Sequence, residues 1–131
     1  MRIVLDSYAV LAYINEEAVA DKVEEYLNLG RSGKAEIYMN VVNLGEVYYI
    51  ISKRSGKGMA NLAVALIRRE PLKLVVADER LALIAGRIKA FHRLSYADAF
   101  AVATAIDLDA TLLTGDSEFK SVEDKVRVEW L

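Results

Sequence analysis

Short aliphatic runs that alternate with longer segments of helical periodicity constrain the fold of this chain more than any other feature. The opening run Arg2–Leu5 ends at Asp6 and Ser7, which indicates a buried strand followed directly by a helix cap. Apolar residues then recur at helical spacing from Ser7 to about Ile14 and from about Glu17 to Leu29. The chain is therefore expected to begin with one strand and two helices.

The same alternation continues to the end of the chain. Further strands are expected at Glu36–Met39, Leu72–Val76, Ala110–Leu113 and Lys125–Glu129. Helices are expected over about Val41–Arg54, Met59–Arg69, Asp78–Phe91 and Ser95–Leu108, with a short helical turn near Glu118. Strands that alternate with helices imply a mainly parallel α/β sheet with helices on both faces. At 131 residues, the chain is expected to form a single domain over residues 1–131.

The composition limits the chemistry that this chain can carry. Cysteine is absent and there is one histidine, which excludes disulfides, thiolate catalysis and metal sites built on sulfur or on several imidazoles. A metal bound here is expected to be a hard cation with oxygen ligands, such as Mg²⁺ or Mn²⁺. The net charge of −2 does not supply a broad positive field, so any contact with RNA must use local patches.

No apolar run reaches the roughly 18 residues that a membrane-spanning helix needs. The amino-terminal segment also lacks the order of charged, apolar and small residues that marks a signal peptide. We therefore expect a cytoplasmic protein without a membrane partner.

Two acidic residues closely follow predicted strands. Asp6 comes directly after Arg2–Leu5, and Asp116 comes after the strand that ends at Leu113. Ligands of an open parallel sheet bind beyond the carboxyl ends of its strands, near the point where the strand order reverses. We expect Asp6 and Asp116 to project from one edge of the sheet if their strands are neighbours.

Two further acids lie on apolar faces of predicted helices. Glu46 has Val42 one turn before it and Ile50 one turn after it, and no Lys or Arg is placed to pair with it locally. Asp98 lies in the least polar helix of the chain, with Val102 one turn further on. Burying a carboxylate without a partner costs several kcal/mol, so something must compensate each of these acids.

A divalent cation is the compensation that the chemistry of four converging acids favours. Two ionised carboxylates at about 4 Å repel by about 4 kcal/mol at an effective dielectric constant of about 20. A bound Mg²⁺ or Mn²⁺ reverses the sign of this interaction, makes a bound water more acidic and neutralises charge on a phosphodiester. The hydroxyls of Ser7, Ser95 and Thr114 are expected to lie near the cluster.

Each acid also has a structural alternative. Asp6 is placed to cap a helix, Asp116 to form a turn, and Asp98 to complete a Ser-x-x-Asp capping box with Ser95. Glu46 has the weakest alternative, in which its carboxylate extends to solvent at the edge of an apolar stripe. Taken singly, the acids leave both interpretations open.

Four segments together resemble the motifs of PIN-domain proteins, and specifically of VapC-like toxins of toxin-antitoxin pairs. They are LD-S at the amino terminus, NLGEV in the third helix, LSYADAFAVATAI, and ATLLTGDSEF. The resemblance spans nearly the full length of the chain. Its specific part is the ordered set of Asp, Glu, Asp and Asp, with the last in Thr-x-Asp before a Phe.

The resemblance implies a PIN-like three-layer α/β/α sandwich and an endoribonuclease site that depends on Mg²⁺ or Mn²⁺. By position, it implies that the catalytic and metal-binding residues are Asp6, Glu46, Asp98 and Asp116, with Thr114 as an accessory hydroxyl. It also implies an RNA substrate, a cognate antitoxin protein as partner, and a homodimer. One residue departs from the family pattern, because Tyr8 stands where many relatives carry a small hydroxyl residue.

Two other classes of protein fit part of the pattern. A catalytically silent PIN-fold module that only binds RNA or a protein partner is the main alternative, and the presence of all four acids argues against it. A phosphoacceptor receiver domain needs an acid pair after the first strand and a Lys after a late strand, and neither stands where it is needed.

Overall fold

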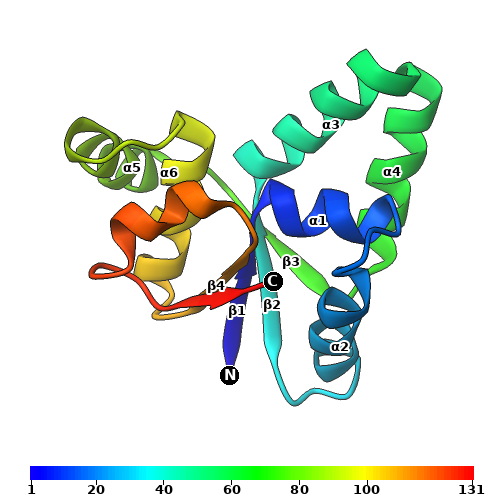
Figure 1. Ribbon diagram of the computed structural model, residues 1–131, viewed down its shortest axis with the longest axis horizontal. Coiled ribbons are helices and arrows are strands. Elements are labelled where there is room, and N and C mark those ends of the chain that lie inside the picture. Colours follow the sequence, from blue (N-terminus) through cyan, green and yellow to red (C-terminus); the bar gives the residue numbers. More distant parts are fainter.

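A five-stranded sheet forms the middle layer of the computed structural model, which describes residues 1–131 (Figure 1). Its strands are β1 (Arg2–Leu5), β2 (Glu36–Asn40), β3 (Leu72–Val75), β4 (Thr111–Thr114) and β5 (Val128–Trp130). The order across the sheet is β3-β2-β1-β4-β5, and every neighbouring pair is parallel. The predicted parallel α/β fold is confirmed, and β1 lies at the centre of the sheet.

Helical segments connect each strand to the next. They are α1 (Ser7–Ile14) and α2 (Ala20–Arg31), α3 (Val41–Ser55) and α4 (Lys57–Arg69), α5 (Glu79–Phe91) and α6 (Tyr96–Asp107), and the 3₁₀ helix η1 (Ser117–Val122) between β4 and β5. None of these helices combines the length and the apolar composition that crossing a membrane requires.

The connections place the helices in two layers. β2 and β3 follow β1 in one direction across the sheet, whereas β4 and β5 lie on the other side of β1. Because β–α–β crossovers are almost always right-handed, connections that run in opposite directions cover opposite faces. Accordingly, α1 to α4 lie on one side of the sheet, and α5, α6 and η1 lie on the other (Figure 1).

Side chains of the central strands alternate between two hydrophobic clusters. Ile3 and Leu5 of β1 pack with residues of α1 to α4, while Val4 between them packs with residues of α5, α6 and η1. Leu113 and Leu112 of β4 divide in the same way. A strand that is buried on both faces needs apolar residues at every position, which explains the unbroken aliphatic runs in the sequence.

Polar residues at the carboxyl ends of the strands begin the helices. Asp6 accepts a hydrogen bond from the N–H of Ala9 at 2.8 Å to begin α1, and Asn40 accepts one from the N–H of Val42 at 2.9 Å to begin α3. These caps satisfy amide donors that a helix leaves unpaired at its start. The edge of the sheet that carries Asp6 is therefore also the edge where α1 and α3 begin, at the upper ends of β1 and β2 in Figure 1.

Two elements, α2 and β5, begin about three residues later than the sequence pattern predicts. The second helix is expected from about Glu17, whereas α2 begins at Ala20. Glu16 has a positive φ of 53°, and the N–H of Ala20 bonds to the carbonyl of Glu17, so these residues form a separate turn. The remaining elements, apart from the last strand, begin within two residues of their predicted positions.

The last strand is predicted over Lys125–Glu129, and β5 begins only at Val128. The N–H groups of Lys125 and Val126 both bond to the carbonyl of Val122, so the chain is still turning at the end of η1. The aliphatic residue Val126 is nonetheless buried, which is why the pattern resembles a strand.

Phe119 holds η1 against the sheet and so supports the turn that carries Asp116. Its side chain is fully buried in the cluster shared with α5 and α6. We expect Phe119→Ala to lower the free energy of unfolding by about 3–5 kcal/mol, because the vacated volume is only partly refilled. Urea denaturation followed by circular dichroism measures this loss.

Leu83→Ala is the matched control, since Leu83 is 65% exposed on α5. It should change the free energy of unfolding by no more than about 0.5 kcal/mol. A loss of less than about 1 kcal/mol in Phe119→Ala would contradict the buried position of the ring.

Candidate metal centre

Asp6 and Asp116 lie where the strand order reverses. β1 pairs with β2 on one side and with β4 on the other, with Leu5 opposite Leu113. Asp6 directly follows β1, and Asp116 follows β4 after Gly115. The two strands are therefore neighbours, and both acids lie at the switch point where parallel sheets bind ligands.

The hydroxyl of Thr114 joins these two acids. It donates a hydrogen bond to Oδ2 of Asp6 at 2.5 Å and accepts one from the N–H of Asp116 at 3.1 Å. Thr114 is fully buried at the end of β4. Its hydroxyl therefore fixes the Asp6 carboxylate relative to the turn that follows β4.

Asp98 reaches the same place from α6. One carboxylate oxygen from each of Asp98, Asp116 and Glu118 lies within 4.8 Å of the other two. Asp98 is buried, Asp116 is half-buried and Glu118 is exposed, so this three-acid set extends from the interior to the surface. Ligand oxygens lie 2.0–2.6 Å from Mg²⁺ or Ca²⁺ in general, so these spacings allow one ion to contact all three.

Glu46 reaches the border of the three-acid set from α3. The hydroxyl of Ser7 donates a hydrogen bond to Oε1 of Glu46, and no protein donor bonds to Oε2. The charge of Glu46 raises the pKa of Asp98, which lies on the neighbouring helix α6, but Glu46 does not belong to the three-acid set. Asp6 and Glu46 therefore lie beside the three-acid set, with Ser7 between them in the sequence and in contact with Glu46.

Burial raises the pKa of Asp6 to about 7. Hydrogen bonds from the Thr114 hydroxyl and the Ala9 N–H act in the opposite direction, and the charges of Asp98 and Asp116 raise the pKa further. Asp6 is 1% exposed, so almost no water solvates its charged form. Its carboxylate therefore retains a proton to an unusually high pH unless a cation neutralises it.

Burial is also the main reason that the pKa of Asp98 rises to about 6. A hydrogen bond from Ser95 lowers it, and the charges of Asp116, Glu46 and Glu118 raise it. The charged neighbours with the largest effect on the pKa of Asp98 are thus all acids. Negative charge is concentrated here in a poorly solvated place.

No basic side chain compensates this charge. The salt bridges of the chain use Lys and Arg elsewhere, and none of them includes an acid of the centre. Two ionised carboxylates 4.8 Å apart repel by about 3 kcal/mol at an effective dielectric constant of about 20. An oxygen-only donor set with several negative charges fits Mg²⁺ or Mn²⁺.

A buried amide oxygen without a partner belongs to Asn43, on the side of α3 that contacts α6. Asn43 lies one turn before Glu46 in α3 and donates from Nδ2 to the carbonyl of Ala97 at 3.1 Å, next to Asp98. The residue is fully buried, and its Oδ1 has no hydrogen-bond partner. An unpaired buried oxygen is unfavourable by itself, and it is the kind of atom that a hard cation or its water binds.

The capping interpretations and the metal interpretation are compatible. Asp6 caps α1, Asp116 caps η1 through the N–H of Glu118 at 3.0 Å, and Ser95 caps α6 through the N–H of Asp98 at 3.1 Å. An ionised carboxylate has about four lone-pair sites, so one capping bond leaves others free. Capping therefore orients Asp6 and Asp116 without exhausting their oxygens.

Glu118 is an acid of the centre that the sequence interpretation missed. It was placed only in a helical turn, and an exposed Glu near a turn is usually a surface residue. The sequence does contain one signal for Glu118. It is the second residue of η1 and follows the cap Asp116 by two positions, so both acids lie at the start of the same helix. The sequence could not show that Asp98 faces this turn.

A separate cavity of about 590 Å³, the α1–α2–α4 cavity, lies between these three helices. Its apolar lining includes Val10, Ile14, Val23, Leu27 and Leu66, and its acidic lining is Glu16, Glu17, Asp21, Glu24 and Glu70. No basic side chain lines it. It contains none of the acids of the metal centre, so the cavity and the metal centre are separate sites.

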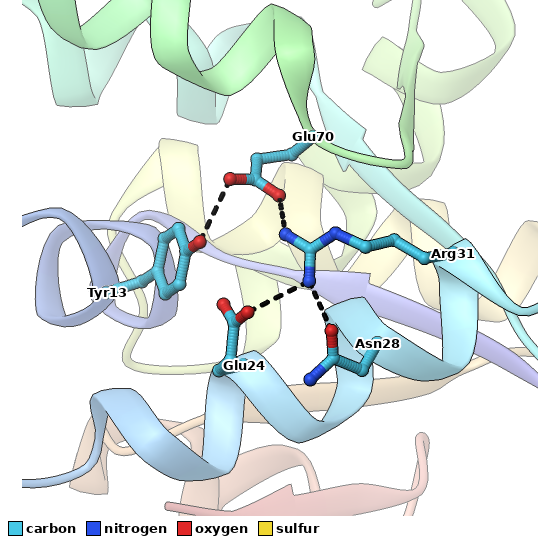
Figure 2. A network of polar contacts seen from close by, with 5 residues as sticks. All are labelled: Tyr13, Glu24, Asn28, Arg31 and Glu70. Atoms are coloured by element: carbon cyan, nitrogen blue, oxygen red, sulfur yellow. Dashed lines mark hydrogen bonds and ion pairs between the residues drawn. The ribbon is translucent and has the colours of Figure 1, made fainter.

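A polar network in the wall of this cavity is shown in Figure 2. Tyr13 of α1 donates to Oε1 of Glu70 at 2.9 Å, and Arg31 of α2 bonds to Oε2 of Glu70 at 2.5 Å. Arg31 also bonds to Glu24 at 2.9 Å and contacts Asn28. The network joins α1 and α2 to the end of α4 and so fixes the walls of the cavity.

The protein thus has a parallel sheet between two layers of helices, with a cluster of carboxylates at the point where the strand order reverses. The chain is a member of the PIN domain family, because the family model described as PIN domain matches residues 3–125. No curated protein sequence matches the chain.

Solved structures of low sequence identity share this fold. VapBC2 from Rickettsia felis bound to a promoter DNA fragment has a TM-score of 0.79 at 19% identity, covering 98% of each chain. DNA-bound VapBC from Salmonella typhimurium has a TM-score of 0.77 at 18% identity, covering 98% of this chain and 97% of that one. VapC20 from Mycobacterium tuberculosis, a toxin described as cleaving the sarcin-ricin loop, has a TM-score of 0.73 at 18% identity, covering 92% and 94%. The predicted PIN domain family is thus confirmed, and the fold is shared with VapC and VapBC structures.

Without metal, the protein should lose stability as the pH rises from about 4 to about 7. In this range the folded state retains protons on Asp6 and Asp98 that the unfolded state has released, so raising the pH favours unfolding. From pH 5 to pH 7.5 we expect a loss of about 3 kcal/mol, mostly from Asp6, which is measured as a falling Tm in EDTA. Mn²⁺ should raise the Tm more at pH 7.5 than at pH 5, because it binds the ionised form.

Asp98→Asn should not destabilise the metal-free protein at pH 7.5, because relieving repulsion offsets a lost hydrogen bond. It should also remove most of the effect of Mn²⁺ on the Tm. Asp107→Asn is the control, since Asp107 pairs with Arg80 at the surface, far along α6 from Asp98. A large drop in the metal-free Tm of Asp98→Asn would favour a purely structural role of this carboxylate.

Proposed function

We propose that this chain is an Mg²⁺- or Mn²⁺-dependent endoribonuclease that acts as the toxin of a toxin-antitoxin pair. The observation that carries the proposal is the three-acid set of Asp98, Asp116 and Glu118, with oxygens within 4.8 Å of one another, beside Asp6 and Glu46. No Lys or Arg pairs with these acids, so a divalent cation is the counter-charge that the site requires. Membership of the PIN family supports the same interpretation.

The carboxylates of the centre would hold the cation: Asp6, Glu46, Asp98, Asp116 and Glu118. A divalent cation supplies a more acidic water and neutralises charge on the phosphate that is cut. Thr114 keeps the Asp6 carboxylate oriented through its hydroxyl, and Ser7 does the same for Glu46. The free Oε2 of Glu46 is available to accept a proton from water.

RNA is the proposed substrate because VapC20, which shares the fold, is described as cleaving the sarcin-ricin loop. A group of exposed basic side chains lies where α3 ends and α4 begins. Its members are Lys53, Arg54 and Lys57, and none of them forms an ion pair. Such a local patch suits the phosphates of an RNA, although the net charge of the chain is −2.

RNA cleavage should require Mn²⁺ or Mg²⁺ and should be lost in Asp6→Asn. The substitution preserves the size of the side chain and removes a charge that faces the cation, so we expect the single-turnover rate to fall about 100-fold or more. End-labelled RNA incubated with EDTA, Mg²⁺ or Mn²⁺ and separated on denaturing gels measures the rate.

Asp124→Asn is the control for this assay, because Asp124 is an exposed acid outside the metal centre whose ion pair is with Lys125. Its cleavage rate should equal that of the unchanged protein. Retention of RNA without cleavage across several divalent metals would instead favour the catalytically silent binding module.

An antitoxin segment is the proposed occupant of the α1–α2–α4 cavity. Glu16, Glu17 and Asp21 line this cavity and form no ion pair. Their charges surround an apolar floor, which suits an amphipathic helix that carries Leu on one face and Arg or Lys at its margins. The solved VapBC complexes that share the fold support a protein partner.

A synthetic amphipathic peptide with Leu at helical spacing and flanking Arg residues should bind the protein, and a peptide with Glu in place of Arg should not. Glu17→Lys combined with Asp21→Lys should weaken binding of the Arg peptide about ten-fold, because two attractive charges become repulsive. Fluorescence anisotropy of the labelled peptide measures the affinity.

Glu25→Lys combined with Asp124→Lys is the control with the same change of charge, since both residues are exposed acids that do not line the cavity. Equal weakening by both variants would mean that only the overall charge matters, and it would remove the cavity from the proposal. The homodimer that the resemblance implies is also a proposal, supported by the exposed apolar side chains of Met59 and Leu62 on α4.

A further inference from the structure

Tyr8 occupies an unusual place beside the metal centre. It is the second residue of α1, two residues after Asp6, and it is 42% exposed. The phenol end of its ring lies on the backbone of Gly115, where an added Cβ would be 2.7 Å from Cζ and 3.0 Å from the hydroxyl oxygen. Gly115 stands between Thr114 and Asp116, so the ring covers the turn that presents Asp116.

Neither packing nor hydrogen bonding accounts for this ring. Tyr8 belongs to neither hydrophobic cluster of the protein, and no hydrogen-bond partner is present for its hydroxyl. The tyrosines that serve a structural purpose here are different, since Tyr13, Tyr38, Tyr48 and Tyr96 all donate hydrogen bonds from their hydroxyls. The Tyr8 ring contacts Gly115, and the residue is 42% exposed, so part of the ring is open to solvent.

An aromatic ring fixed in this position suits a nucleobase. A phosphate bound at the acids has its adjoining nucleotide within reach of the ring, because the ring lies on Gly115, next to Asp116. Unpaired bases bind proteins by stacking on aromatic side chains, and this contact tolerates any base. The centre itself repels the RNA backbone until a cation is bound, so an uncharged contact is a useful source of affinity.

We infer that Tyr8 is a stacking platform for an unpaired base next to the phosphate that is cut, so that the site selects single-stranded over fully paired RNA. The inference rests on the proposed nuclease function for its substrate. This position of the Tyr8 ring requires glycine at position 115, because any side chain there would displace the ring.

Stacking is tested with abasic RNA. For the unchanged protein, removing the base next to the cut should raise the KM about ten-fold, and Tyr8→Leu should raise it by a similar factor on intact RNA. The two losses should not add, because they remove the two partners of one contact. Tyr8→Phe should restore the KM, and kcat should stay within about two-fold throughout.

Tyr49→Leu is the matched control, since Tyr49 is an exposed tyrosine of α3, 52% accessible. It should leave the KM for intact RNA and the abasic penalty unchanged. Tyr8→Leu with a lowered kcat, a lowered Tm and an unchanged abasic penalty would mean that the ring only supports the turn, which overturns the inference.

A binding measurement separates this inference from the nuclease proposal. Tyr8→Trp in a Trp130→Phe background carries one tryptophan, because Trp130 is the only one in the chain. Its emission should be quenched by a single-stranded RNA oligonucleotide in Mg²⁺ and much less by the abasic RNA or by a duplex. Quenching without cleavage would overturn the nuclease proposal alone, whereas RNA binding with unchanged emission would overturn the role of Tyr8, and no RNA binding at all would overturn both.

Discussion

Carboxylates of like charge, gathered at the carboxyl ends of β1 and β4 without a basic partner, are the constraint on which the rest of the structure depends. Burial removes the water that would otherwise stabilise Asp6 and Asp98, and it raises the pKa of each. A protein keeps such an arrangement only if other interactions hold the acids in place. Here those interactions come from the sheet and from the starts of the helices.

The same backbone features that begin the helices also orient the acids. Asp6 satisfies the start of α1 and Asp116 the start of η1, and both carboxylates retain free lone pairs. Thr114 then couples Asp6 to the turn after β4, and Asn43 couples α3 to α6 near Asp98. The same side chains therefore begin helices and supply the carboxylates of the metal centre.

Much of this arrangement follows from local sequence, and the parts that do not have physical reasons. The unbroken aliphatic runs predict buried parallel strands, and the acids after them predict the edge at which a ligand binds. The start of β5 was placed too early, because Val126 is buried by a turn and a strand equally well. Glu118 was overlooked because an exposed acid gains meaning only when Asp98, 20 positions earlier, is brought beside it.

By itself, the sequence determined the alternation of strands and helices, the absence of sulfur and multiple-histidine chemistry, and the four acids at Asp6, Glu46, Asp98 and Asp116. Tertiary structure decided which oxygens meet, that no Lys or Arg meets them, and that Tyr8 lies on Gly115. The physical reason is the difference in sequence separation between the residues that interact. Helix periodicity, strand patterns and caps depend on neighbours within a few residues, whereas desolvation and charge repulsion depend on groups that only the closed fold brings together.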